Sequence, residues 1–210
     1  MPLIASTWGW VSITEMNKMQ FTHRREMLRR MGAASLGISP LLASHVFAAT
    51  FMDVEQAQKL LLPQADSFSA VSLSLDDAKL SDIAKTTDTR VPKNFNPQIW
   101  RANQGPKTLG WVITDRVIGK YDAIDYVAGF TTAGAVTALE VLAYRESHGA
   151  EIRQAAWRQQ FAGRKGPGQL RFGDDIRNIS GATLSCQHVT EGMQRLSALV
   201  SLLPPMKAGA

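Results

Sequence analysis

Apolar and polar positions along the chain indicate helices first, then strands, then a long final helix. Residues 52–62 and 75–86 carry apolar side chains at helical intervals, which predicts two short helices. Asp53 stands where it can cap or charge the first turn of the first helix, and Pro63 ends that helix. Residues 87–107 contain three prolines and three asparagines, so we expect a connector there.

From residue 108 the pattern changes to the alternation that is typical of strands. Residues 109–113, 123–130 and 135–144 are three such segments, and the short links between them predict an antiparallel meander. Residues 150–163 return to helical spacing, and residues 183–203 carry one continuous apolar stripe. The predicted fold class is therefore α+β: an antiparallel β-sheet meander with flanking helices and a long C-terminal helix.

The N-terminal part of the chain has the composition of a targeting signal. Arg24-Arg25 precedes a mildly apolar stretch, residues 31–47, which is rich in Ala, Gly and Ser and is followed by Ala48. This order of charge, apolar stretch and small residues resembles a twin-arginine export signal. We expect cleavage after Ala48 and a periplasmic mature protein, with an uncleaved membrane anchor as the alternative.

Composition and charge narrow the possible functions. The chain has 210 residues, of which 45% are hydrophobic and 20% charged, as in ordinary globular proteins. Its formal net charge is +5, but residues 49–210 hold 18 basic and 16 acidic residues, so nucleic-acid binding is not expected. The single cysteine, Cys186, excludes an internal disulfide, and the four histidines lack the spacing of metal ligands.

The most informative motif begins the predicted C-terminal helix, where residues 180–185 are Ser-Gly-Ala-Thr-Leu-Ser. Free backbone N–H groups and the helix dipole favour an anion at such a position. Gly181 and Ala182 leave room for a phosphate to approach the backbone. The motif predicts a phosphate-binding turn, with a plain helix cap as the alternative. The hydroxyl donors would come from Ser180, Thr183 and Ser185.

The same six residues resemble the flavinylation motif of FMN-binding domains. These domains occur in the FMN-carrying subunits of the sodium-pumping NADH:quinone reductase and of Rnf-type complexes, and in small exported proteins. The resemblance implies FMN as the cofactor, held by a phosphoester to Thr183 that a flavin transferase installs. The predicted cofactor contacts at the motif are Ser180, Gly181, Ala182, Thr183, Leu184 and Ser185.

Two further stretches are similar to the same family, and the resemblance covers roughly residues 105–200. Residues 117–120, Val-Ile-Gly-Lys, precede a strand, as in stand-alone members. Residues 144–149 resemble a family segment that follows a strand, lies near the flavin and leads into a helix. This second stretch implies flavin contacts at Glu146, Ser147, His148 and Gly149.

One position departs from the family pattern. The acidic residue usual three positions before the motif is replaced by Arg177, with Asp174 and Asp175 slightly upstream. Arg177 would either neutralise the FMN phosphate or remain a solvated surface charge.

The resemblance implies an electron carrier rather than a stand-alone catalyst, and we assign no catalytic residue. Its implied partners are a flavin transferase and membrane or periplasmic redox proteins. Two alternatives stay open: a flavin-free exported module that binds a phosphorylated ligand, and a flavin-dependent reductase of a small acceptor. The expected organisation is a signal segment over residues 1–48, a helical lead-in and connector over 49–104, an FMN-binding domain over 105–203 and a tail over 204–210.

Overall fold

A computed structural model describes residues 49–204. The predicted export signal, its cleavage site after Ala48 and the last six residues of the predicted tail lie outside the described residues. Within the described part, no helix combines the length and the apolar character that crossing a membrane requires.

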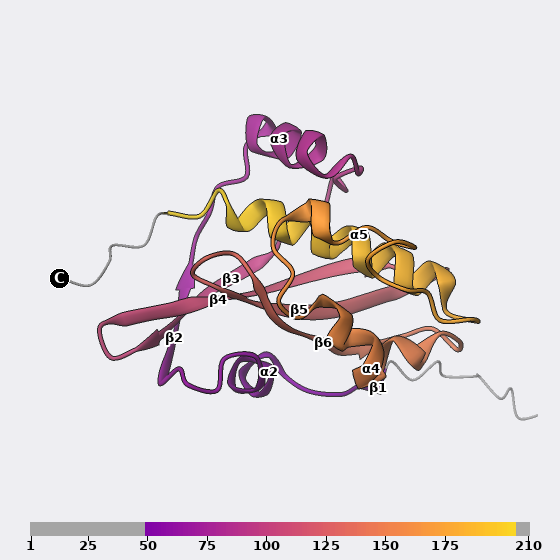
Figure 1. The fold of residues 1–210 in the computed structure, drawn as a ribbon, viewed down its shortest axis with the longest axis horizontal. Coiled ribbons are helices and arrows are strands. Elements are labelled where there is room, and N and C mark those ends of the chain that lie inside the picture. The colour runs from indigo at the N-terminus through magenta and orange to yellow at the C-terminus, as the bar shows by residue number, and fades with distance from the viewer. Residues whose placement is uncertain (1–48, 205–210) are drawn as a thin grey trace, which may run out of the picture. The chain divides into compact units, whose positions relative to one another are not determined.

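The strands of the described part form one antiparallel sheet. They are β1 (Ala49–Thr50), β2 (Ser67–Val71), β3 (Gln98–Gln104), β4 (Lys107–Ile118), β5 (Ala123–Thr131) and β6 (Val136–Tyr144). Their order in the sheet is β1-β6-β5-β4-β3-β2 (Figure 1), so β2 to β6 are a meander and β1 is added at the edge. This confirms the predicted antiparallel meander and the α+β class.

Four α-helices flank the sheet in residues 49–204: α2 (Val54–Leu61), α3 (Asp77–Thr87), α4 (Ala155–Arg158) and α5 (Thr183–Val200). The two front helices and the long C-terminal helix are confirmed. Asp53 caps α2 by accepting from the backbone N–H of Gln56 at 2.7 Å, and Asp76 caps α3 in the same way. The continuous helix expected over residues 150–163 is wrong, because Gln154 has extended backbone and separates a 3₁₀ turn (Ala150–Arg153) from α4.

The connector expected over residues 87–107 is also corrected, because it contains β3. This strand lies between Pro97 and Pro106, and pairs with β4 along its whole length. Its side chains alternate, so that Ile99 and Ala102 are buried on opposite faces of the sheet. The prolines lie on either side of the strand and do not interrupt it. The proline content of the segment therefore suggested a connector although a strand lies within it.

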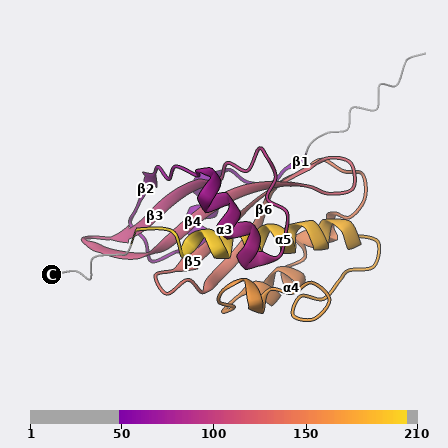
Figure 2. The ribbon, with the colours of Figure 1, turned by 90° about the horizontal axis from the view of Figure 1, so that it is seen from above.

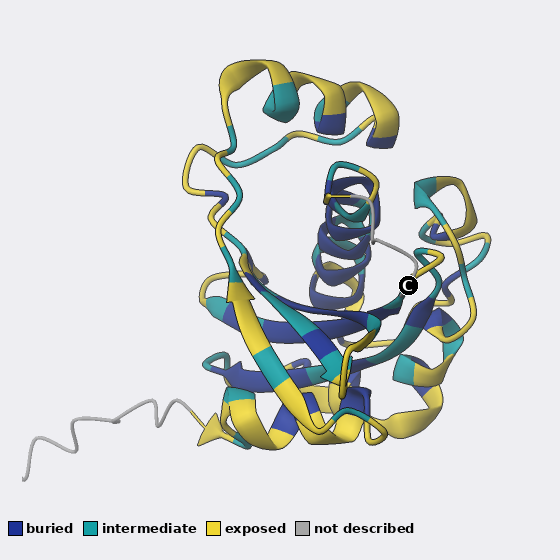
Figure 3. Cartoon of the chain, turned by 90° about the vertical axis from the view of Figure 1, so that its left-hand side faces the viewer, coloured by how far each residue is buried: buried dark blue, intermediate teal, exposed yellow. Residues whose placement is uncertain are grey.

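The two faces of the sheet are covered by different helices. α5 lies on one face and α2 on the other, while α3 packs on the outer side of α5 (Figures 1 and 2). The larger core lies between the sheet and α5, and includes Ile113, Phe130 and Leu196. A smaller core under α2 includes Val112 and Val127. Figure 3 shows α5 buried over most of its length between α3 and the sheet, whereas most of α3 is exposed.

Candidate functional site

A pocket of about 550 Å³ opens where the β4–β5 turn, the loop after β6 and the start of α5 meet. In the sheet register Ile118 pairs with Ala123 and Ile124 with Tyr144, which brings the turn and the loop to the same end of the sheet. This volume lies within the roughly 300–1,000 Å³ of small-molecule sites. The lining residues are Lys120, Tyr121, Asp122, Glu146, Ser147, His148 and residues 181–185.

The first turn of α5 forms one wall of this pocket and has no side-chain cap. Ala182 occupies the N-cap position and offers no hydrogen bond from its side chain. Within the described residues, the backbone N–H groups of Thr183, Leu184 and Ser185 donate to no other residue. They are therefore free to bind an anion, which the helix dipole also favours.

The Thr183 side chain is exposed at this turn. Its Oγ1 accepts a hydrogen bond from Asn178 Nδ2 at 2.9 Å. Because the amide is the donor in this contact, the hydroxyl proton of Thr183 remains uncommitted. The side chain is thus held in place while its oxygen keeps the capacity to react.

A buried cluster attaches the loop after β6 to the start of α5. The hydroxyl of Tyr144 donates to the carbonyl of His148 and lies 3.0 Å from Ser185 Oγ. A tyrosine has one hydroxyl proton, so the Ser185 hydroxyl must be the donor to Tyr144. Burial raises the pKa of Tyr144, which keeps that proton in place at neutral pH. We therefore expect Ser185 to fix the loop rather than to donate to a phosphate.

Gly149 belongs to the same cluster and lies beneath the pocket. Its φ is +90°, and a Cβ at this position would lie 2.4 Å from Tyr144 Oη and 3.0 Å from Ser185 Oγ. Both the backbone conformation and the close packing therefore require glycine. Its role in this structure is to let the loop approach the helix.

Glu146 and His188 hold the β4–β5 turn from two sides. Glu146 Oε1 accepts the backbone N–H groups of Tyr121 and Asp122 at 2.8 and 3.1 Å. His188 Nδ1 lies 2.6 Å from the carbonyl of Ile118 and 3.0 Å from that of Gly119. Since carbonyls only accept, Nδ1 carries a proton. The turn is thus pinned to both the loop after β6 and α5.

The rim of the pocket carries two exposed apolar side chains. Tyr121 is 76% exposed and Leu184 is 41% exposed. Ser147 and His148, whose side chains lie 2.8 Å apart, add an exposed polar edge. The pocket therefore offers an anion-binding end at α5 and an apolar, partly aromatic rim, a combination suited to a flat ring with a phosphorylated tail.

Sequence reasoning anticipated much of this lining. Eight of the ten predicted contacts line the pocket, whereas Ser180 and Gly149 do not. Their contact with FMN stays a prediction. Tyr121 and Asp122 were not identified. The sequence signal that would have found them is the Gly-Lys-Tyr-Asp turn between two predicted strands. An antiparallel meander places this turn at the same end of the sheet as the end of β6.

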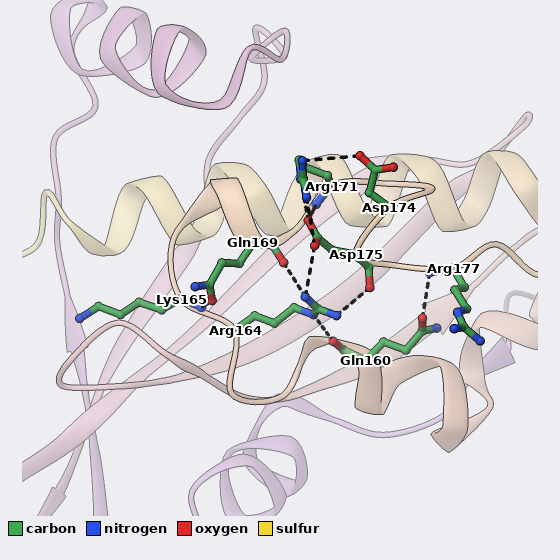
Figure 4. Close-up of polar contacts among 8 residues, drawn as sticks. All are labelled: Gln160, Arg164, Lys165, Gln169, Arg171, Asp174, Asp175 and Arg177. Atoms are coloured by element: carbon green, nitrogen blue, oxygen red, sulfur yellow. Dashed lines mark hydrogen bonds and ion pairs between the residues drawn. The ribbon is translucent and has the colours of Figure 1, made fainter.

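The loop before α5 is braced by ion pairs (Figure 4). Asp175 lies 2.9 Å from Arg171 Nε and 3.6 Å from Arg164 Nη1, and Arg164 also donates to the backbone carbonyl of Asp175 at 2.7 Å. The hydrogen bond from Arg171 lowers the pKa of Asp175, so its carboxylate stays ionised at neutral pH. These contacts fix the segment that leads into the motif.

Arg177 is positioned through its backbone. Its N–H donates to Gln160 Oε1 and its carbonyl accepts from Trp157 Nε1, both at 2.8 Å. Figure 4 shows its guanidinium free of the ion pairs that brace the loop, and the residue is exposed. Arg177 does not line the pocket at Thr183, and its contact with a phosphate stays a prediction.

The fold and the site define a class: an α+β domain with a small-molecule pocket at an uncapped helix N-terminus. Residues 119–198 match the family model of the FMN-binding domain. The match includes the β4–β5 turn, the loop after β6 and nearly all of α5, and so all three walls of the pocket. The matched residues are consistent with an FMN-binding domain, and the match indicates FMN as the cofactor. No curated protein gives a significant match.

The residues present fit FMN. The free N–H groups of the first turn of α5 suit its phosphate, and Lys120 adds a positive charge at the same pocket. Tyr121 and Leu184 offer apolar surface to the ring. The exposed Thr183 hydroxyl lies between these two parts of the lining.

Proposed function

We propose that this protein is an exported electron carrier whose FMN is attached by a phosphoester to Thr183. The observation that carries the proposal is the exposed Thr183 hydroxyl on an uncapped helix turn, inside a pocket that the FMN-binding domain encloses. Export is supported by the Arg24-Arg25 segment and the small-residue site at Ala48. The flavin-free alternative loses its support because the domain matches an FMN-binding family.

Attachment exchanges one phosphorus–oxygen bond for another. The new bond joins Thr183 Oγ1 to the phosphorus of FMN, and the bond that breaks joins this phosphorus to the leaving group of the transferase's activated flavin substrate. The hydroxyl proton is lost to a base of the transferase. Asn178 orients Oγ1 from one side, and the N–H groups of the first turn stabilise the phosphate charge.

Bound FMN supplies the redox chemistry and passes electrons singly or in pairs. The first turn of α5 would hold its phosphate, and Tyr121 and Leu184 would offer apolar surface to the ring. A covalent link suits a carrier outside the cytoplasm, because a dissociated cofactor would be lost. The proposed partners are a flavin transferase and membrane or periplasmic redox proteins.

The test of attachment is flavin fluorescence that stays with the protein after denaturing electrophoresis. Co-expression with a flavin transferase should give a fluorescent band for the natural chain. Thr183→Val keeps the side-chain shape but removes the oxygen, so fluorescence should disappear while circular dichroism is unchanged. Thr183→Ser should retain part of the signal. The matched control is Ser180→Ala, an exposed hydroxyl outside the pocket lining, which should keep at least half of it. Undiminished fluorescence on Thr183→Val contradicts the attachment site.

The test of export is fractionation of cells that produce the full chain. Replacing Arg24 and Arg25 together by Lys should leave the protein in the cytoplasm, because the twin-arginine route reads this pair. The natural chain should appear in the periplasm, starting near Ala49. Normal export of the Lys-Lys variant would remove this part of the proposal and leave the attachment site standing.

A further inference from the structure

A second pocket, of about 530 Å³, lies between α5, the end of β4 and the segment that follows α3. We call it the arginine pocket. It shares no lining residue with the pocket at Thr183. Four cationic side chains line it, together with the single carboxylate of Glu191. The cationic residues are Arg90, Lys93, Arg116 and Arg195.

Arg195 is the central observation, because it is buried without a partner for its charge. It is 4% exposed. Its Nε has no hydrogen-bond partner, and its Nη1 makes a long contact of 3.4 Å to the carbonyl of Arg90. Within residues 49–204 no carboxylate forms an ion pair with it. A guanidinium has five N–H donors, and burying it unpaired is unfavourable.

Two carboxylates, Asp115 and Glu191, lie nearby, but neither forms an ion pair with Arg195 within the described residues. Asp115, on β4, accepts the hydroxyl of Tyr126 at 2.8 Å, and burial raises the pKa of its carboxyl. Glu191 Oε1 accepts a hydrogen bond from Gln187 at 2.9 Å. The charge of Arg195 acts against this rise in the pKa of Asp115, but Asp115 forms no ion pair with Arg195 within the described residues.

The other three cations of the pocket differ in their pairing. Arg116 pairs with Asp125, which also pairs with Arg145. Arg90 and Lys93 are exposed and form no ion pair within the described residues. The pocket lining thus holds two exposed positive charges without an ion pair and a third that is buried. This arrangement attracts an anion and then encloses it.

We propose that the arginine pocket binds a small oxyanion, a carboxylate or a phosphate group, between Arg195 and the side chains of Arg90 and Lys93. A planar guanidinium matches two oxygens of either group with two parallel hydrogen bonds. Pro92, Val117 and Ile118 form an apolar wall of the pocket, which suits the short carbon chain of an organic acid. The bound oxyanion would supply acceptors and a negative charge to the Arg195 guanidinium.

Arginine side-chain Nε–Hε signals in ¹⁵N–¹H NMR spectra of the full chain report oxyanion binding at Arg195 directly. Inorganic phosphate and succinate are titrated separately, with ionic strength held constant by sodium chloride. The Arg195 signal, assigned by its loss in Arg195→Lys, should move saturably with at least one of the two. Movement with phosphate alone identifies a phosphate site, and movement with succinate alone a carboxylate site.

Matched variants separate the arginine pocket from the rest of the surface. Arg90→Ala and Lys93→Ala should each weaken binding by up to about fivefold, as expected for exposed charge pairs. Lys85→Ala removes an exposed cation of α3 outside the pocket and should bind like the natural chain.

Two results would overturn the proposal. The first is an Arg195 signal that phosphate and succinate move no further than sodium chloride does. The second is equal affinity in the Arg90→Ala, Lys93→Ala and Lys85→Ala proteins, because binding would then depend on net charge alone. Neither result bears on whether FMN is attached to Thr183.

Discussion

Thr183 and Leu184 lie exposed at the first turn of α5, beside a pocket and with free backbone N–H groups. Further along the same helix, Met193 and Leu196 are fully buried. Gly192 there packs so tightly that a Cβ would lie 2.1 Å from the hydroxyl of Tyr126. One helix therefore serves two purposes: its middle fixes the fold and its first turn presents unsatisfied groups to a ligand.

This contrast implies that stability and binding are separable along α5. Substitutions in the middle should unfold the domain before they affect a ligand. Substitutions at the first turn should change binding while the fold stays nearly as stable, because few packing contacts are lost there.

The largest expected effect is the difference in stability between alanine variants of two leucines of α5, one buried and one exposed. Leu196→Ala should lower the free energy of unfolding by about 2–5 kcal/mol, because it opens a cavity in the core. Leu184→Ala, at a 41% exposed position, should change it by less than about 0.5 kcal/mol. Urea denaturation followed by circular dichroism measures both. Equal losses would mean that the first turn is as structural as the middle.

Two glycines near the first turn sharpen the comparison. Gly149 and Gly181 have φ of +90° and +88°, so alanine is strained at both. A Cβ at Gly181 meets nothing within 4 Å, whereas one at Gly149 meets Tyr144 Oη at 2.4 Å. Gly149→Ala should therefore be less stable than Gly181→Ala by about 1–3 kcal/mol, the usual cost of overpacking. Indistinguishable urea midpoints for the two variants would show that the loop after β6 moves to accept the added methyl group without a loss of stability.

The smallest expected effect is a pH dependence from the buried polar groups under α5. Burial raises the pKa of Asp115, although the Tyr126 hydrogen bond opposes this. The folded state then holds the proton more tightly than the unfolded state, so Asp115 costs stability as the pH rises above about 3.9, the ordinary aspartate value. Asp115→Asn still accepts from Tyr126 and should gain stability relative to the natural chain between about pH 4 and pH 7.

Asp125 serves as a control, because its contribution to stability should change with pH in the opposite direction to that of Asp115. Burial acts to raise the pKa of Asp125, but hydrogen bonds from Arg116 and Arg145 outweigh it and leave the pKa lowered. Its contribution is present above the ordinary aspartate pKa and is lost as the pH falls. Asp125→Asn should therefore be destabilised most at neutral pH and least in acid. Parallel pH profiles for the two variants, from urea denaturation, would contradict both assignments.

The sequence predicted the centre of the fold because the signal there is strong. The strands β4, β5 and β6 and the helix α5 carry regular apolar patterns, and the structure confirms them. β2 was not anticipated, since Ser67–Val71 is a short and largely exposed edge strand with no long apolar run to mark it. The single helix expected over 150–163 failed at Gln154, where the chain turns to extended backbone.

The candidate site was predictable where it is local and not where it depends on packing. The motif of residues 181–185 and the loop residues 146–148 line one pocket, as their chemistry suggested. The burial of Arg195 was not foreseeable, because its contact with Arg90 joins positions 105 residues apart. Periodicity locates a residue on a helix face, but only the packing of the segment after α3 shows that this face is closed.

The central claim is that Thr183 carries the flavin, and peptide mass mapping tests it most directly. The full chain is co-expressed with a flavin transferase, denatured, digested and analysed by fragmentation. We expect one peptide to gain the mass of FMN less one water, with the added mass on Thr183. An added mass on Ser180 or Ser185, or an unmodified Thr183 peptide from a protein that stays fluorescent after denaturation, would contradict the account.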